Sequence, residues 1–334
     1  MKLVRVGLAL ILGLILISGV FAGGRRDGQT INLVGGTMLP EGHIFHRTVQ
    51  YFQQRMAVNY TGQYTVNISV HHSGTLGSEL DAIELMIQGV AVDFYIVSPA
   101  WLATWDNTIP IVDAPFLFRD QDHWLRVIEQ SAALQPLEDA ALRAGIRFLG
   151  HGGGSARHLI SRTPAHSVAD FPGIRLRVQG SPVHQRAFSA AGFPATPLDF
   201  MEVYNAIATG VIDALENESA GLLGGRFFEV APYYVLTSHQ IVTRSLAFSE
   251  RRFQTLPACV QQAILVSGAE AAAFHRRTEM AEEQSLIDQM VRENGLRVIP
   301  FDNTEMFRMA MPAVEEFARE LGAEHIMRAI QDVR

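Results

Sequence analysis

Residues 170–217 place a cation and an amide where they could bind a carboxylate together. The segment reads DFPGIRLRVQGSPVHQRAFSAAGFPATPLDFMEVYNAIATGVIDALEN, a pattern that predicts strand, helix, helix, strand. In GIRLRVQ, Arg175 and Arg177 share one strand face, and a guanidinium can bind a carboxylate through two hydrogen bonds. Asn217 ends the second strand with an amide that both donates and accepts. Alternation does not choose between the arginines, and a solvated strand face or a turn-capping asparagine would give the same pattern.

The two helices between those strands have clear boundary signals. The first begins at Ser181, with Pro182 at its first position and Gly192 after its end. Asp199 and Glu202 fit a capping box at the start of the second helix. These elements would hold the arginines and the asparagine at neighbouring strand ends.

A second unit earlier in the chain has the same layout. Ser78 can cap a helix over Glu79–Gln88, and the apolar segment VAVDFYIV (90–97) then predicts a strand. Its pattern of apolar helix, glycine, valine and an aspartate-bearing strand matches VYNAIATGVIDALEN, with Asp93 corresponding to Asp213. We therefore expect an α/β protein of two halves with mainly parallel sheets and a shared cleft.

Composition excludes several classes of protein. With 334 residues, a formal charge of −7 and no basic stripe, the chain is not expected to bind nucleic acid. Lys2 is the only lysine and Cys259 the only cysteine, which excludes a lysine Schiff base, an intramolecular disulfide and a CxxC pair. The paired histidines lack a third ligand at a recognisable spacing, so neither a metal nor another cofactor is expected. The HGGG at 151–154 resembles an esterase loop, but the chain has no G-x-S-x-G.

The N-terminus predicts export. Residues 1–22 combine a basic start, an apolar run and a small-residue site, which indicates a signal peptide cleaved after about Ala22. An uncleaved anchor or a buried helix is the alternative interpretation. Residues 23–30 are expected to be a flexible leader.

Long-range features come from the rest of the chain. His151–Ser155 is predicted to be a loop between two strands, and Tyr233–Thr237 and Gln240–Ser249 are predicted to be separate strands. Residues 257–294 are helical in pattern, on the order of 50 Å in length. This helix either breaks near Gly268 or runs along both halves.

Several long motifs resemble one known family, the substrate-binding receptors of tripartite ATP-independent periplasmic (TRAP) transporters of the DctP-like type. The likeness covers nearly all of the chain after the signal peptide. The motifs are LPEGHIFH, SGTLGSELDAIELMIQGVAVDF, DAPFLFRD, ARHLISRTP, DFPGIRLRV, PLDFMEVYNAIATGVIDALEN and FFEVAPYYVLTSH.

The resemblance implies a two-lobe periplasmic binding protein fold, α/β in class, with crossing hinge strands and a long helix spanning both lobes. Lobe I would comprise 31–154 and 243–282, and lobe II would comprise 155–242 and 283–334.

The resemblance also implies the ligand-binding residues. The family arginine that pairs with the ligand carboxylate falls on Arg177, a second arginine on Arg157, and the asparagine of the usual QENP on Asn217. The remaining pocket positions fall on Glu79, Ser98 and Phe200. On residue type alone, Phe200 and Trp101 could either stack on a ligand or belong to the core.

This chain departs from the family in two places. Leu215 and Glu218 replace the glutamine and proline of QENP, and HGGGSA precedes Arg157 where an aromatic or asparagine-bearing strand is usual. These departures leave three ligand classes open: a uronate or other sugar acid, a C4-dicarboxylate and a 2-oxo acid. The polar partners offered by Glu79, Ser98 and the HGGG segment favour the sugar acid.

We therefore expect a periplasmic, non-enzymatic and monomeric receptor that delivers a small organic acid to the membrane subunits of a TRAP transporter. Two alternatives remain. The first is a receptor for a signalling system. The second is an exported hydrolase or isomerase, for which Glu79 and Glu216 would be the candidate carboxylates.

Overall fold

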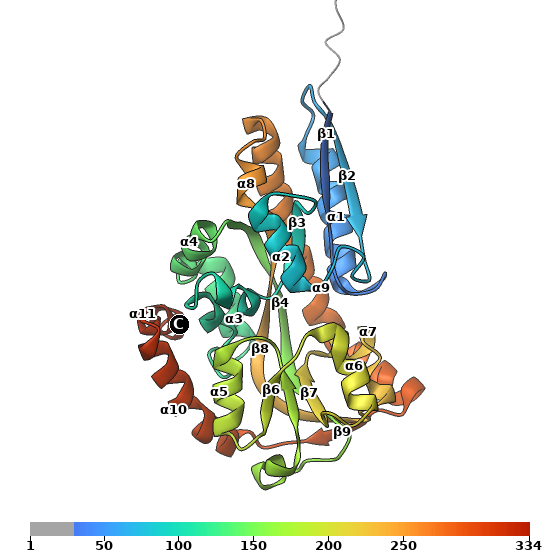
Figure 1. The fold of residues 1–334 in the computed structure, drawn as a ribbon, viewed down its shortest axis with the longest axis vertical. Coiled ribbons are helices and arrows are strands. Elements are labelled where there is room, and N and C mark those ends of the chain that lie inside the picture. Colours follow the sequence, from blue (N-terminus) through green and yellow to red (C-terminus); the bar gives the residue numbers. More distant parts are fainter. Residues whose placement is uncertain (1–29) are drawn as a thin grey trace, which may run out of the picture.

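The computed structural model describes residues 30–334 (Figure 1). The predicted signal peptide, its cleavage site after Ala22 and residues 23–29 of the predicted leader lie outside the described residues. Thr30, the last residue assigned to the leader, begins the first strand. Within the described part of the chain, no helix has both the length and the apolar character needed to cross a membrane.

Strands and helices alternate along the described chain, as the sequence predicts. The strands are β1 (Thr30–Gly36), β2 (Thr65–His71), β3 (Phe94–Val97), β4 (Ile146–Ser161), β5 (Leu176–Val178), β6 (Ala195–Pro197), β7 (Ala214–Asn217), β8 (Tyr233–Ser249) and β9 (Arg297–Pro300). The α-helices are α1 (Ile44–Asn59), α2 (Glu79–Gln88), α3 (Gln121–Gln130), α4 (Gln135–Arg143), α5 (Pro182–Ala190), α6 (Phe200–Ala208), α7 (Ser219–Gly224), α8 (Glu250–Phe253), α9 (Ala258–Asn294), α10 (Thr304–Glu320) and α11 (Glu324–Gln331). Short 3₁₀ helices lie at Pro99–Thr104, Ile109–Asp113, Val168–Gly173 and Phe227–Glu229.

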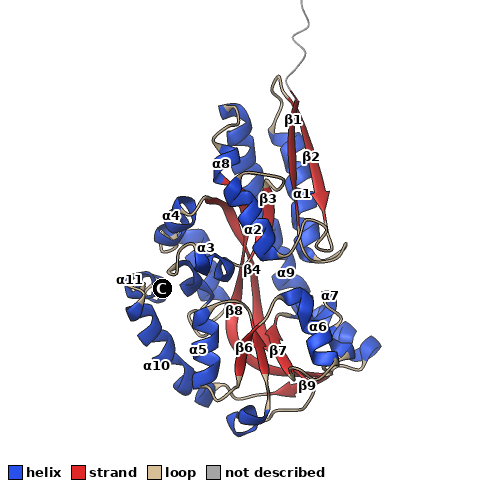
Figure 2. Ribbon diagram, in the orientation of Figure 1, coloured by secondary structure: helices blue, strands red, loops and turns tan. Residues whose placement is uncertain are grey.

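Two long antiparallel strands, β4 and β8, connect the lobes (Figures 1 and 2). The sheet order is β2-β1-β3-β8-β4-β7-β5-β6, with β9 beside β8. On one side β1 pairs in parallel with β2 and β3, and on the other β5 pairs in parallel with β6 and β7. This arrangement confirms the predicted two-lobe α/β fold with crossing strands.

The same hydrogen bond, from a backbone N–H to an aspartate carboxylate, occurs at the inner strands of both lobes. In the first lobe, Asp93 Oδ2 accepts the backbone N–H of Val34 at 2.7 Å. In the second, Asp213 Oδ2 accepts the backbone N–H of Arg175 at 3.1 Å. The structural equivalence matches the helix–glycine–strand pattern that relates the two halves in the sequence. Strand β3 is nevertheless shorter than predicted, because residues 89–92 form the turn after α2.

The capping predictions have different outcomes. Ser78 and Asp81 form a complete capping box at the start of α2. Asp199 is the N-cap of α6, as predicted, but its carboxylate accepts from Met201 N at 2.9 Å. Glu202 is exposed and does not complete a box, so that detail of the prediction is wrong.

The HGGG segment is part of strand β4, so the predicted loop is wrong. Its glycines accommodate close neighbours instead. A Cβ on Gly152 would lie 2.3 Å from His275 Nδ1 of α9, and one on Gly153 would lie 2.3 Å from the Val242 carbonyl oxygen of β8. Glycine favours a loop in a sequence pattern, but here pairing with β8 keeps the chain extended. Strand β8 is also one element, although the sequence predicts two.

Helix α9 is unbroken over 37 residues, about 55 Å in length. It packs against α1 of the first lobe, against the crossing strand β4 and against α7 of the second lobe. Gly268 lies within the helix without interrupting it, and it packs closely against Leu149 of β4. A Cβ added to Gly268 would lie only 2.4 Å from the Cβ of Leu149. The long helix therefore spans both lobes.

The apolar core continues from one lobe into the other. One cluster of buried side chains includes both Trp124 of α3 and Phe317 of α10. The C-terminal segment also bonds to the α3 region, where Arg119 Nη1 donates to the Gln331 carbonyl at 2.7 Å. Because the core is continuous, the residue boundaries given above for lobes I and II stay a prediction.

We predict that Gly153→Ala lowers the free energy of unfolding by roughly 2–4 kcal/mol. Gly153 has φ +103°, and its added Cβ would meet a backbone oxygen that cannot move aside as a side chain could. Gly173→Ala is the matched control, because nothing lies within 4 Å of its added Cβ. Urea unfolding of both variants would measure the difference, and equal stabilities would show that β4 tolerates a side chain at this crossing.

Candidate functional site

A small cavity lies between the lobes where β5 and β7 end. Its free volume is about 20 Å³, little more than one water molecule occupies. The residues that line it are Met38, Leu39, Phe45, Glu79, Trp101, Arg157, Arg177, Gln179, Phe200, Asn217, Glu218 and Arg244. We call it the interlobe cavity.

Five of the six predicted site residues line the interlobe cavity: Arg177, Arg157, Asn217, Glu79 and Phe200. Parallel pairing of β5 with β7 brings Arg177 and Asn217 to the same edge of the sheet. Ser98 is buried behind the cavity wall, and its hydroxyl donates to Asp113 Oδ2 at 2.8 Å. Trp101, which the sequence left undecided between ligand and core, also lies at the cavity.

Arg177 is a buried cation with few partners. Its side chain is 2% exposed, and in the described chain its one hydrogen bond runs from Nε to the Leu198 carbonyl at 2.8 Å. The guanidinium carbon lies 5.9 Å from the centre of the Phe200 ring. No carboxylate of the described residues forms an ion pair with it, and burial lowers its pKa to about 10. Arg177 therefore stays protonated at neutral pH and presents an unneutralised charge to the cavity.

Arg175 has a different environment from Arg177, although alternation in the sequence did not distinguish the two arginines. Its side chain is half exposed and bonds to both carboxylate oxygens of Asp213, at 2.7 and 2.8 Å. It does not line the interlobe cavity.

Arg157 also lines the cavity, but its charge is already paired. Its Nη1 donates to Asn217 Oδ1 at 2.8 Å and to Glu218 Oε2 at 2.7 Å. Its Nε pairs with Glu216, a carboxylate that His239 also approaches. Although burial alone would raise the pKa of Glu216, Arg157 and His239 hold it well below its usual range. Because every nitrogen of Arg157 bonds within the protein, it is less available to an external anion than Arg177.

Asn217 is held in one orientation by its neighbours. Its amide oxygen accepts from Arg157, as described above, and its Nδ2 faces the start of α7. A Cβ on Gly221 would lie 2.2 Å from that nitrogen, so any side chain there would displace the Asn217 amide. The hydrogen bond from Arg157 and the close packing of Gly221 both favour the present orientation of the amide.

Glu79 of α2 is a buried carboxyl group that also lines the interlobe cavity. Its Oε1 accepts the backbone N–H of Ser98. Burial raises its pKa to about 7, although Arg244 and the Ser98 N–H act in the opposite direction. At neutral pH the group is thus close to half protonated and can either donate or accept a hydrogen bond.

Arg244 of β8 is a cavity residue that the sequence analysis missed. It is 6% exposed, its Nη2 lies 3.6 Å from Glu218 Oε2, and its guanidinium carbon lies 5.8 Å from the Phe45 ring centre. It is the single charged residue in TRSLAFS (243–249), a segment of β8 in which every residue is buried. An arginine embedded in a predicted strand drew attention to Arg177, and the same signal would have found Arg244.

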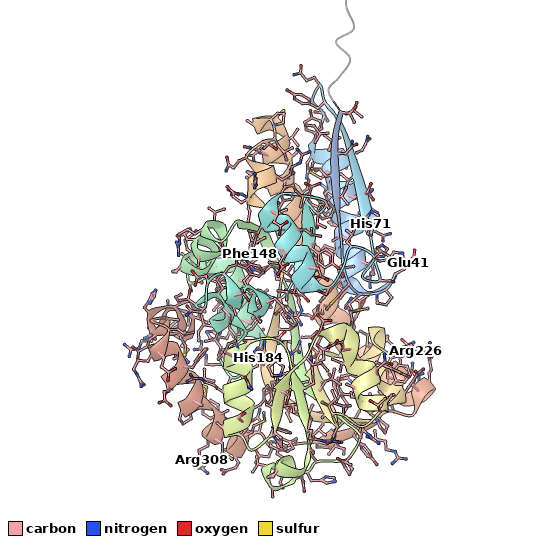
Figure 3. The ribbon with its side chains drawn as sticks, in the orientation of Figure 1. Glu41, His71, Phe148, His184, Arg226 and Arg308 are labelled. Carbon is pink, nitrogen blue, oxygen red and sulfur yellow. The ribbon has the colours of Figure 1, made fainter. Side chains whose placement is uncertain are left out.

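Gln179 extends the polar wall beyond Arg177. Its amide nitrogen lies 3.1 Å from Nε2 of His184, a buried residue of α5 (labelled in Figure 3) whose Nε2 also lies 2.9 Å from Gln240 Oε1 of β8. Among residues 30–334, no group of three or more histidine, cysteine, aspartate or glutamate side chains is placed to hold a metal ion. The cavity is thus built from arginines, carboxyl groups, amides and aromatic rings.

Comparison with known proteins places this site in context. Residues 35–320 match the family described as bacterial extracellular solute-binding protein, family 7. A TRAP periplasmic solute-binding protein from Sulfitobacter sp. NAS-14.1, solved with bound α-D-taluronate, is 38% identical with a TM-score of 0.86, over 90% of this chain and 97% of that one. One from Citrobacter koseri, solved with bound D-glucuronate, is 28% identical with a TM-score of 0.83, over 91% and 100%. The C4-dicarboxylate-binding periplasmic protein DctP of Vibrio cholerae is 26% identical over 79% of each chain.

We predict that Glu79 makes stability depend on pH. Its pKa is about 7 in the folded protein against an ordinary value of 4.5, so its stabilising effect is complete below about pH 4.5 and is lost as the pH rises through 7. Relative to Glu79→Gln, the wild type should lose about 3 kcal/mol of unfolding free energy between pH 4.5 and 8. Urea unfolding at several pH values would measure this.

Glu84→Gln is the matched control, because Glu84 lies on the exposed face of the same helix. A parallel pH dependence of Glu79→Gln and the wild type would contradict the assignment.

Proposed function

Because the chain belongs to family 7 of the bacterial extracellular solute-binding proteins and serves a TRAP transporter, we propose that its ligand is a hydroxylated monocarboxylate of the uronate class, bound through Arg177. The observation that carries this proposal is the buried guanidinium of Arg177, which has no carboxylate partner in the described chain. A ligand carboxylate would supply the missing counter-charge and accept two hydrogen bonds. Closure of the lobes would remove water and strengthen that ion pair.

Charge balance around the cavity favours one ligand carboxylate over two. Three arginines, Arg157, Arg177 and Arg244, line the cavity, and the carboxylates of Glu216 and Glu218 lie beside Arg157. Arg157 is paired with both of those carboxylates, and Arg244 lies near Glu218. Arg177 is the one of these three arginines without an ion-paired carboxylate among the described residues, which suits a ligand with one carboxylate. Glu218 stands where the family usually has proline, so this charge balance is a property of the present chain.

The remaining cavity groups suit hydroxyls and a sugar ring. Glu79, Asn217 and Gln179 provide acceptors and donors for hydroxyl groups. Phe200 and Trp101 would pack on the apolar face of the ring. The two solved relatives described above hold taluronate and D-glucuronate, each of which is a sugar acid with one carboxylate. Ser98 would act through Glu79, since it donates its backbone N–H to that carboxyl group.

We also propose where the protein acts and what it does with its ligand. The chain would be exported with cleavage after Ala22, act as a monomer in the periplasm and hand its ligand unchanged to the membrane subunits. Catalysis is not expected, because Glu216, one of the two candidate acid–base residues, is locked in its pair with Arg157. A signalling receptor with the same site would bind the same ligand but would not need those membrane subunits for uptake.

We predict that Arg177→Ala reduces affinity for D-glucuronate at least 100-fold, because the ligand carboxylate would enter a buried site without a counter-charge. Isothermal titration calorimetry would measure the affinity, and thermal unfolding should show the loss of ligand-dependent stabilisation. Arg175→Ala is the control and should bind like the wild type, since Arg175 faces solvent and pairs with Asp213. Near wild-type affinity in Arg177→Ala would refute the assignment.

We also predict that Glu218→Gln shifts selectivity towards dicarboxylates. The substitution removes a negative charge beside Arg157 and Arg244, so a second ligand carboxylate would find an unmatched cation. The ratio of succinate affinity to D-glucuronate affinity should rise about tenfold or more, equivalent to about 1.4 kcal/mol. Glu202→Gln, on the exposed face of α6, is the control. An unchanged ratio would show that Glu218 does not set the charge preference.

A further inference from the structure

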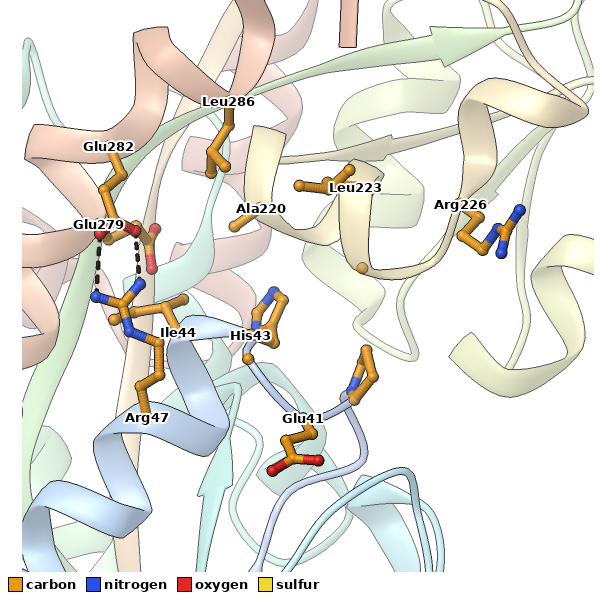
Figure 4. A pocket seen from close by; sticks show the side chains of 13 residues that line it. Glu41, His43, Ile44, Arg47, Ala220, Leu223, Arg226, Glu279, Glu282 and Leu286 are labelled. Atoms are coloured by element: carbon orange, nitrogen blue, oxygen red, sulfur yellow. Dashed lines mark hydrogen bonds and ion pairs between the residues drawn. The ribbon is translucent and has the colours of Figure 1, made fainter. Parts of the chain in front are cut away.

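A larger cavity, with a free volume of about 360 Å³, lies between the first turn of α1, helix α7 and helix α9 (Figure 4). Both arginines that line it are already paired with glutamates. Arg47 donates to Glu282 at 2.8 and 3.0 Å, as Figure 4 shows, and Arg226 Nε donates to Glu229 at 2.8 Å. Arg177 has no such partner among the described residues. The residues that decide the choice of a carboxylate ligand are therefore expected around the interlobe cavity.

A chain of buried hydrogen bonds leads from Asp113 to the interlobe cavity. Asp113 is fully buried, and its Oδ2 accepts from the Ser98 hydroxyl at 2.8 Å and from the Ala100 backbone N–H at 2.9 Å. Burial raises the pKa of Asp113, whereas Arg244 and these two hydrogen bonds act in the opposite direction. Its Oδ1 lies 3.4 Å from the amide nitrogen of Gln240 on β8. Because a carboxylate can only accept, Gln240 must direct its NH2 group to this oxygen.

The orientation of Gln240 fixes the position of the proton on His184. With its NH2 group on Asp113, Gln240 places Oε1 2.9 Å from His184 Nε2. Burial lowers the pKa of His184 to about 4, so the ring is neutral at physiological pH and carries one proton. Nδ1 is buried and has no hydrogen-bond partner among the described residues, whereas Nε2 has an acceptor. The proton therefore lies on Nε2, which donates to Gln240.

Gln179 is the second neighbour of the same ring nitrogen. Its amide nitrogen lies 3.1 Å from His184 Nε2, so two N–H donors face each other while that nitrogen donates to Gln240. A half-turn of the Gln179 amide about its last side-chain bond removes this conflict, because Oε1 would then accept from Nε2. The NH2 group would take the present place of Oε1. That oxygen has no hydrogen-bond partner in the described chain and is not among its enclosed unpaired polar atoms.

We propose that Gln179 binds the ligand as a hydrogen-bond donor, and that His184 is the positioning residue that selects this orientation. Gln179 follows Arg177 by two residues, which places both side chains on one side of the strand, and both residues line the interlobe cavity. The NH2 group would donate to a ligand oxygen next to the carboxylate that Arg177 holds. The ring oxygen and the carboxylate of a uronate can each accept this bond. The role in ligand choice rests on the proposed function, whereas the orientation of the amide does not.

Asp113→Asn tests the chain at the end far from the cavity. The two donors at the Oδ2 position keep the oxygen of the new amide there, so its NH2 group faces Gln240. Gln240 would then turn its own NH2 group to His184, the ring proton would move to Nδ1, and Gln179 would donate to Nε2 and present its oxygen to the ligand. D-Glucuronate affinity, measured by isothermal titration calorimetry, should fall at least tenfold because two acceptors would face each other. Loss of the negative charge alone would tighten the binding of an anion, so weaker binding identifies the reversal.

The double substitution Asp113→Asn with Gln240→Glu should restore the wild-type order of donors and acceptors. The new carboxylate accepts from the new amide on one side and from His184 Nε2 on the other, and total charge and side-chain shape are those of the wild type. D-Glucuronate affinity should return to within about threefold of the wild type. Asp122→Asn, at the exposed start of α3, is the control and should bind normally. Unchanged affinity in Asp113→Asn, or a loss that the double substitution does not restore, would overturn the proposal.

A neutron crystal structure of the wild-type protein would locate the same protons without any ligand. It should show a proton on Nε2 of His184 and none on Nδ1, with the NH2 group of Gln179 directed into the interlobe cavity. A proton on Nδ1, a protonated Asp113 or a Gln179 oxygen that faces the cavity would overturn the proposal. Failure of the wild type to bind D-glucuronate would instead overturn the proposed function, because the neutron structure decides the orientation of Gln179 independently.

Discussion

The burial of three arginines in one space between the lobes is the constraint on which the structure depends. A guanidinium removed from water needs a counter-charge or several hydrogen bonds. Arg157 obtains both from Glu216, Glu218 and the Asn217 amide, and this network joins crossing strand β4 to the tip of β7. Among residues 30–334, Arg177 on the neighbouring strand obtains one hydrogen-bond acceptor, the Leu198 carbonyl. The two arginines therefore differ in that Arg157 is neutralised within the protein, whereas Arg177 has no ion-paired carboxylate among the described residues.

The crossing strands and the long helix make this charge arrangement possible. Strands β4 and β8 carry Arg157 and Arg244 through the junction, so the cations belong to both lobes. Helix α9 lies directly over β4, where glycines replace side chains and permit close packing. Arg276 Nη1 of α9 also donates to the His151 carbonyl of β4 at 2.6 Å. Movement of one lobe against the other must therefore occur about a junction that is densely packed on one face.

The interlobe cavity gathers arginines and carboxyl groups, so the preference of the proposed site would follow from how these groups pair with one another. The cavity is bounded by elements of both lobes, since α2 carries Glu79 and β5 carries Arg177. A ligand bound there would contact both lobes at once and would stabilise the arrangement in which both contacts form.

The sequence by itself determined the elements, the family pattern and most of the interlobe cavity. Periodicity and capping residues identified α2, α5 and α6 because those signals act within a few residues. Choosing Arg177 over Arg175 required the family resemblance, and only tertiary packing showed why. Arg177 enters the cavity at the end of β5, whereas Arg175 reaches Asp213 at the surface. The HGGG segment is a strand and not the predicted loop because β8 pairs with it. Ser98 does not line the cavity as predicted, because its hydroxyl bonds to Asp113 and its backbone N–H bonds to Glu79. Long-range pairing of this kind leaves no periodic signal in the chain, so only the tertiary structure could decide it.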